Sequence, residues 1–225
     1  MPFIRIENIC LPRSESFWIF YRNGCPGGLV LTESKAAISA KWDAVYRLGE
    51  ISDYRPAEVL SGNAFLLPQN GAALDLACGL GANARLLATA GLAVFAWDIS
   101  TVAVEKLQDD ADKKGLAIQA KQCAIDKKSF FGYRFDVIVI SRFLDRSLCD
   151  AIIGALNPGG LLFYQTYTRE KVVERGPNNP DFLLAEGELL ELFAELKLIY
   201  YRENGSVGSI GLGLRNEAQF IGRKR

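Results

Sequence analysis

Residues 73–83 read Ala-Leu-Asp-Leu-Ala-Cys-Gly-Leu-Gly-Ala-Asn, and the next apolar run along the chain ends at Asp98. The first run predicts a buried strand and a tight turn, because Gly79 and Gly81 lack a Cβ and adopt conformations that other residues rarely take. Asp98 follows the second predicted strand, where a carboxylate can accept hydrogen bonds from both hydroxyls of a ribose. Two neighbouring strands that each carry a carboxylate near the end predict a nucleoside site.

The glycine spacing alone has a second interpretation. Gly79-Leu-Gly81-Ala-Asn-Ala84 fits the G-x-G-x-x-G/A fingerprint of nicotinamide-dependent enzymes. Asp75 argues against that interpretation, because it adds a negative charge two residues before the turn, where a pyrophosphate would gain nothing from it. A cationic ligand would gain from the same charge. A plainer alternative is that Asp75 caps a loop and that the glycines only form a tight turn.

An acid within the strand, followed by Ala77-Cys-Gly-Leu-Gly81, resembles the motif of class I S-adenosylmethionine-dependent methyltransferases. That cofactor carries an ammonium and a sulfonium and no phosphate. The resemblance covers roughly residues 40–225. Within this class, Asn157-Pro-Gly-Gly160, residues 179–184 and Trp42-Asp-Ala-Val-Tyr46 resemble the small bacterial methyltransferases of the tellurite-resistance type. This closer resemblance implies a small-molecule acceptor, often a soft nucleophile such as a thiol or a chalcogen oxyanion.

The resemblance implies S-adenosylmethionine as the cofactor and places its binding residues at the ends of the first four strands. These residues are Asp75, Ala77, Cys78, Gly79, Gly81, Asn83, Asp98, Ile99, Ile125, Asp126, Ser141 and Arg142. Ile99 would lie against the purine, or it would pack under the sheet. Asp126 would meet the adenine amino group, unless Cys123 or Ala124 takes that place. Asp126 could instead cap a turn, as aspartate readily does.

The acceptor would meet the cofactor beyond the fourth strand, because open α/β sheets bind ligands at their carboxyl ends. Arg142 could hold the cofactor carboxylate or an anionic substrate there, or it could be a surface arginine paired with Asp145. Trp42 and Tyr46, at i, i+4 spacing on one helix, would cover the sulfonium by cation–π contact or would simply pack in a core. The acceptor-side residues that we expect are Trp42, Tyr46, Tyr167, Asn179 and Phe182.

No metal is needed for displacement at a sulfonium, which is accelerated mainly by positioning and by exclusion of water. An acceptor that carries a proton would need a base, and the chain contains no histidine. Either the acceptor is already ionised, or Tyr167, Asp145 or Asp181 serves as the base. A non-catalytic module that binds the cofactor for ligand or partner binding is the second functional class, because a fold alone does not establish activity.

Strand and helix signals alternate from about residue 71 onward and predict a Rossmann-like seven-stranded α/β sheet with helices on both faces. The Gly-rich connection between the last two strands predicts an antiparallel hairpin at the C-terminal edge, which nicotinamide-binding folds lack. The predicted helices are 81–90, 101–114, 148–156 and 186–195; the later strands are 118–125, 135–140, 161–167, 196–201 and 218–222, with a turn at 157–160.

Length and charge restrict the remaining choices. The 225 residues suffice for one methyltransferase-like domain at 34–225, preceded by an extension at 1–33 that acts as a lid or packs as an added strand or dimer contact. The 26 basic and 26 acidic side chains offer no general attraction for nucleic acid. Five cysteines without a C-x-x-C, and no signal peptide or membrane span, predict a cytoplasmic protein. The oligomeric state is left open.

Overall fold

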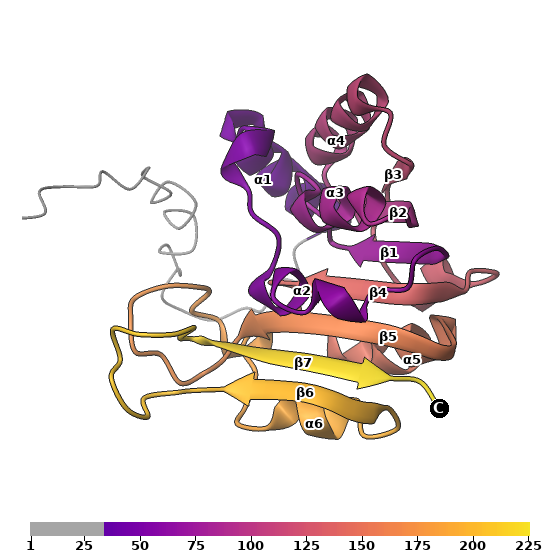
Figure 1. The fold of residues 1–225 in the computed structure, drawn as a ribbon. Coiled ribbons are helices and arrows are strands. Elements are labelled where there is room, and N and C mark those ends of the chain that lie inside the picture. Colours follow the sequence, from indigo (N-terminus) through magenta and orange to yellow (C-terminus); the bar gives the residue numbers. More distant parts are fainter. Residues whose placement is uncertain (1–33) are drawn as a thin grey trace, which may run out of the picture.

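The computed structural model describes residues 34–225, which form one seven-stranded sheet with helices on both faces (Figure 1). Its helices are α1 (Lys35–Leu48), α2 (Glu58–Ser61), α3 (Ala82–Thr89), α4 (Thr101–Lys114), α5 (Cys149–Ala155) and α6 (Glu188–Leu192). Its strands are β1 (Ala72–Leu76), β2 (Ala93–Asp98), β3 (Ile118–Gln122), β4 (Phe135–Ser141), β5 (Leu156–Tyr167), β6 (Lys197–Glu203) and β7 (Glu217–Arg223). The predicted extension at 1–33 lies outside the described residues.

The strand order is β3-β2-β1-β4-β5-β7-β6. The first five strands in this order run parallel, whereas β7 is antiparallel to both of its neighbours, β5 and β6. The predicted sheet with an antiparallel edge hairpin is therefore confirmed. Because β7 runs the opposite way, its first residue, Glu217, lies at the carboxyl ends of the parallel strands, opposite Tyr167.

The central strand β4 shows why these strands are apolar at every position. Val137 and Val139 lie in the core beneath α2, α3 and α4, whereas Ile138 and Ile140 lie in the core against α5 and α6. All four side chains are fully buried. A strand covered on both faces has no solvent side and so shows no alternation. Polar groups of the central strands can therefore reach a ligand only at the strand ends.

The helix bounds follow local signals where these are strong. Helix α4 spans the predicted 101–114, because Ser100 caps its first turn through Ala103 N and Gly115 ends it at φ 62°. Helix α3 likewise starts after Gly81, at φ 71°. No helix within residues 34–225 is long and apolar enough to cross a membrane.

Three predicted bounds were wrong. The expected turn at 157–160 belongs to β5, as an irregularity between Leu156, which pairs with Phe135, and Leu161, which pairs with Val137. The third strand ends at Gln122 instead of 125, and the next residue donates its N–H to Asp98 O. Helix α6 is half the predicted length, because Gly187 adopts φ 70° just before it and Phe193 leaves the helical region just after it.

Candidate functional site

In the turn after β1, every second residue has a positive φ. Ala77, Gly79 and Gly81 all have positive φ, at 55°, 52° and 71°. This conformation is costly for alanine and easy for glycine, so the two glycines match the turn that the sequence predicts. The turn is tied to the next strand, because Cys78 N donates to Trp97 O at 3.0 Å. Cys78 itself is buried.

Asp98 ends β2 directly beside this turn. Its Oδ2 accepts a hydrogen bond from Gly79 N at 2.8 Å, and its Oδ1 accepts one from Ser100 N at 2.9 Å. Burial raises the pKa of Asp98, and the nearby charge of Asp43 raises it further. A carboxylate offers about four acceptor positions, so two bonds to the backbone leave capacity for ribose hydroxyls.

Asp75 is fully buried inside β1. Its Oδ2 accepts from Ala84 N at 2.9 Å and its Oδ1 accepts from Asn83 Nδ2 at 3.3 Å, which joins the strand to the first turn of α3. Burial raises the pKa of Asp75 to about 7. The side chain thus caps the first turn of α3, whereas the plainer interpretation expected it to cap a loop. Its contact with a ligand ammonium stays a prediction.

Asp43, which the sequence analysis did not identify, forms a group of three carboxylates with Asp75 and Asp98. It lies on α1, where its Oδ1 accepts hydrogen bonds from Ser100 Oγ at 2.6 Å and Val102 N at 3.2 Å. Its charge acts on Asp98, and the charge of Asp98 acts on Asp75, in each case raising the pKa. Any cation placed near this turn would relieve that repulsion, whereas an anion would add to it.

Helix α1 covers the glycine turn. Trp42 and Tyr46 stack on each other with ring centroids 5.6 Å apart, as their i, i+4 spacing predicts. Tyr46 is buried, and a Cβ added to Gly79 would lie 2.7 Å from its hydroxyl oxygen. The pair therefore lies beside the turn, and Tyr46 packs directly against it. A contact of either ring with a sulfonium remains a prediction.

The residues expected around an adenine follow β2 and β3. Asp126 is exposed and caps a short helix, Lys127–Phe130, by accepting hydrogen bonds from Lys128 N and Ser129 N at 2.9 and 3.0 Å. Ile99 is half-buried, and Ile125 packs against the α5 side of the core. The cap shows what Asp126 does within the chain, and its contact with adenine stays a prediction.

Asn83, on α3, connects the turn after β1 to the end of β4. Its Nδ2 donates to Ser141 Oγ at 3.1 Å as well as to Asp75, so the ends of β1 and β4 are linked. The next residue, Arg142, has φ 53° and donates its N–H to Gln165 O at 2.8 Å. Its side chain does not take the alternative partner considered from the sequence, Asp145, because that carboxylate caps the turn at Ser147.

Arg142 instead forms an ion pair with Glu217, with Nε 3.7 Å from Oε1. Glu217 is buried, and its Oε2 accepts from Gln165 Nε2 at 2.7 Å. Gln165 in turn accepts from Val59 N at 2.9 Å and Gln219 Nε2 at 3.0 Å. Neither Glu217 nor Gln165 was identified from the sequence. Gln165 accepts from a residue 106 positions away, and no local pattern reports a partner at that separation.

The segment after β5 holds the remaining acceptor-side residues. Asn179 caps the short helix Pro180–Phe182, and Phe182 is 48% exposed. Arg146 fixes this segment by donating to Asp181 O at 2.7 Å and Leu183 O at 3.0 Å while pairing with Glu188. In Figure 1, α1 and this segment lie toward the same ends of the parallel strands. Their enclosure of one cleft stays a prediction.

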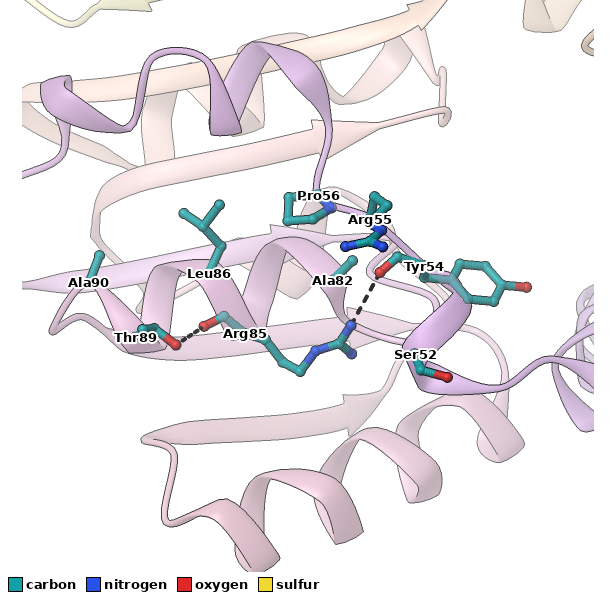
Figure 2. Close-up of a pocket in the computed structure, with 9 residues that line it drawn as sticks. All are labelled: Ser52, Tyr54, Arg55, Pro56, Ala82, Arg85, Leu86, Thr89 and Ala90. Carbon is teal, nitrogen blue, oxygen red and sulfur yellow. Dashed lines mark hydrogen bonds between the residues drawn. The ribbon is translucent and has the colours of Figure 1, made fainter. Parts of the chain in front are cut away.

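Two hollows, of about 530 and 440 Å³, lie elsewhere on the described part of the chain. Figure 2 shows the larger one, beside α3, with Arg55 and Arg85 at its wall. The guanidinium of Arg85 already donates to Leu80 O at 2.7 Å and Ile51 O at 3.1 Å, so it fastens the segment before α2 to α3. The larger hollow is lined by the segment before α2 and by α3, and the smaller one by that segment, Arg85 and α4. Neither wall includes a predicted site residue.

Comparisons with known proteins agree with the motif. A family model described as a methyltransferase domain matches residues 73–160, which run from β1 into β5. The ubiquinone biosynthesis O-methyltransferase of Actinobacillus pleuropneumoniae is 29% identical over 106 residues, which is 43% of this chain and 45% of that protein. The match therefore spans less than half the length of that relative.

Solved structures extend the similarity to most of the fold. TehB from Haemophilus influenzae covers 75% of this chain and 62% of its own, with 23% identity and a TM-score of 0.59. The cyclase SpnF covers 88% of this chain and 98% of its own, with 16% identity and a TM-score of 0.66. Residues 73–160 are therefore similar to a methyltransferase domain, and the fold of the chain is similar to the folds of these two solved structures.

Proposed function

We propose that this chain binds S-adenosylmethionine at the glycine turn and transfers its methyl group to a small-molecule acceptor in the cytoplasm. The observation that carries the proposal is the group of three carboxylates, Asp43, Asp75 and Asp98, around a turn with alternating positive φ. The residues present fit this cofactor, whose ammonium and sulfonium would offset the repulsion that raises the pKa of Asp75 and Asp98.

The same carboxylates disfavour a dinucleotide. A pyrophosphate at a glycine turn needs backbone N–H groups and the positive end of a helix. Here Gly79 N donates to Asp98 and Ala84 N donates to Asp75, so two N–H groups at this turn are already bound to carboxylates. A phosphate placed there would also lie beside the negative charges.

Each part of the site would have one task. When bound, the cofactor supplies a methyl group that is activated by its sulfonium. Asp98 would accept hydrogen bonds from the ribose hydroxyls, and Asp75 would attract the ammonium through its charge. Tyr46 and Trp42, which stack on each other beside the turn, would keep water away from the methyl group. Arg142 would bind the cofactor carboxylate or an anionic acceptor beyond β4. The protein's contribution to the rate is then chiefly orientation.

Two of the three base candidates, Tyr167 and Asp145, are poorly suited to take a proton from the acceptor. The chain contains no histidine, and burial raises the pKa of Tyr167, so its hydroxyl stays protonated at neutral pH. Asp145 is engaged as a cap by Ser147. We therefore favour an acceptor that arrives ionised or is a soft nucleophile, such as a low-pKa thiol or a chalcogen oxyanion, over an alcohol or an amine that must lose a proton.

The second candidate is a module that binds the cofactor without transferring a methyl group. It is favoured by the similarity to SpnF, which is named a cyclase although it has the same fold. Fold alone does not choose between the two classes.

A methyl-transfer screen separates the two candidates. The protein would be incubated with methyl-labelled S-adenosylmethionine and, separately, thiols, chalcogen oxyanions, phenols and a folded RNA. Transfer to a small molecule that is lost in Asp98→Ala and kept in the exposed control Asp109→Asn supports the enzyme. Cofactor binding without transfer to any class supports the binding module, and transfer to the RNA contradicts the small-molecule acceptor.

A further inference from the structure

The carboxyl edge of the sheet carries opposite charges in two adjoining regions, the acidic end at β1 and β2 and the basic end at β4 and β5. The glycine turn after β1 gathers Asp43, Asp75 and Asp98, whereas the end of β4 and β5 gathers Arg142 and Arg175 around Tyr167. Asn83 joins the two ends, because its Nδ2 donates both to Asp75 and to Ser141. A cationic ligand held at one end would therefore lie next to a basic group at the other.

The ion pair at the basic end is asymmetric. The side chain of Glu217 is 1% exposed, while that of Arg142 is 41% exposed. The carboxylate is fixed from behind by Gln165 Nε2 at 2.7 Å, and it faces the Nε of Arg142 at 3.7 Å. A guanidinium has five N–H donors, so the long contact to Glu217 and a hydrogen bond to Tyr167 do not use up its capacity. The negative partner is buried and the positive one remains accessible.

The backbone holds Arg142 in this position at a cost. Its φ of 53° lies in the left-handed region, which a side chain disfavours. The N–H of Arg142 donates to Gln165 O, and the side chain of the same glutamine holds Glu217. One residue on β5 thus orients both partners. Strain of this kind is kept where the surrounding structure requires a side chain at a particular place.

A second arginine approaches from the segment after β5. Asn216 holds that segment by accepting from Val172 N at 2.9 Å and donating to Val173 O at 2.7 Å. The segment packs on Tyr167, since a Cβ added to Gly176 would lie 2.7 Å from the ring. The charges of Arg142, Glu217 and Arg175 all act on Tyr167, so two guanidinium groups and one carboxylate surround this hydroxyl.

We propose that Arg142 is the anion-binding group of the acceptor pocket and that the acceptor carries a carboxylate in addition to its nucleophile. This inference rests on the proposed function, because it uses the cofactor to fill the acidic end of the edge. Arg142 would orient the acceptor by a forked hydrogen bond to both carboxylate oxygens. Glu217 is a positioning residue that fixes the guanidinium and does not touch the acceptor.

The test is a calorimetric titration of the full chain loaded with S-adenosylhomocysteine, using 4-mercaptobenzoate and thiophenol as a matched pair of probes. We expect the wild type to bind 4-mercaptobenzoate at least about ten-fold more tightly than thiophenol, as a charge-assisted hydrogen bond implies. Arg142→Gln should lose this preference and keep its affinity for S-adenosylhomocysteine. Arg134→Gln, an exposed arginine at the opposite end of β4, should keep both.

A second variant protects the test against misfolding. Arg142→Gln leaves Glu217 as a buried charge that has lost its partner, so Arg142→Gln/Glu217→Gln removes both charges together. Loss of the preference in the double variant supports the proposal in the same way. Equal binding of the two probes by the wild type overturns it. So does weaker binding of S-adenosylhomocysteine in Arg142→Gln with the preference kept, which would assign Arg142 to the cofactor carboxylate. A wild type that binds no S-adenosylhomocysteine overturns the proposed function itself.

Discussion

The hydroxyl of Tyr46 lies directly over Gly79, so that a Cβ at position 79 would lie 2.7 Å from it. The sequence analysis predicted a tight turn here because Gly79 lacks a Cβ. In the structure the missing Cβ also makes room for the side chain of Tyr46 on α1. The glycine therefore serves two purposes, a left-handed turn at φ 52° and the close packing of a helix that covers the site.

Gly79→Ala should be more destabilising than left-handed strain alone explains. The strain costs ~1–2 kcal/mol, and the contact with Tyr46 adds an overpacking cost of ~1–3 kcal/mol. Gly115→Ala is the matched control, because its φ of 62° is similar and nothing lies within 4 Å of an added Cβ. Urea unfolding of both variants checks this. An equal loss of stability in the two would show that Tyr46 does not press on position 79.

Asp98→Ala should weaken binding of S-adenosylhomocysteine by at least about ten-fold, because each lost charge-assisted hydrogen bond to the ribose is worth ~1.5–3 kcal/mol. The same change also leaves the N–H groups of Gly79 and Ser100 without their acceptor, so some stability will be lost. Asp98→Asn keeps one acceptor oxygen, so its affinity for S-adenosylhomocysteine should lie between those of the wild type and Asp98→Ala. Calorimetry on all three proteins measures this, and wild-type affinity in Asp98→Ala would mean that the ribose binds elsewhere.

Stability should depend on pH through Asp75. Its pKa is about 7 when folded, against a usual value of 3.8, because burial disfavours the charge. Between these values the folded protein holds a proton that the unfolded chain has lost, so the free energy of unfolding falls as pH rises through this window. Asp98, whose pKa burial also raises, acts in the same direction. Asp75→Asn should flatten the decline in urea titrations between about pH 5 and about pH 7. An unchanged slope would contradict the assignment to Asp75.

Phe182→Ala should raise the acceptor KM several-fold while leaving the Kd for S-adenosylhomocysteine close to that of the wild type. The reason is that Phe182 is half-exposed on the segment after β5, which Arg146 fixes, and we propose that this segment covers the acceptor. The exposed Phe131, between the capped turn after β3 and β4, offers a control. If Phe131→Ala raised the KM as much, the enclosure by Phe182 would be refuted.

The sequence predicts what local signals determine. Helix α4 matches because Ser100 and Gly115 mark both of its ends, and β4 is recognisable because it is buried on both faces. The start of β5 was mispredicted because Asn157-Pro-Gly-Gly160 has the composition of a turn, although the chain forms an irregular strand there. Turn composition does not show whether the flanking residues continue the same ladder.

The residues of the candidate site likewise divide into those that a local signal reveals and those that it does not. Gly79, Asp75 and Asp98 were found because their spacing along the chain is itself the signal. Asp43 and Glu217 were missed because each meets its partner across a long sequence separation: Ser100 lies 57 positions from Asp43, and Gln165 lies 52 positions from Glu217. In the sequence, a single acid in a helix or at the start of a strand looks the same as a surface acid. Its partners become visible only when the fold brings distant segments together.

The account's central claim is that the acidic turn after β1 holds a cationic nucleoside cofactor. Isothermal titration of the full chain with S-adenosylhomocysteine, S-adenosylmethionine and NAD tests it most directly. We predict saturable binding of the first two at one site per chain, weakened in Asp98→Ala, and no binding of NAD. Tight binding of NAD with no response to S-adenosylhomocysteine would contradict the claim.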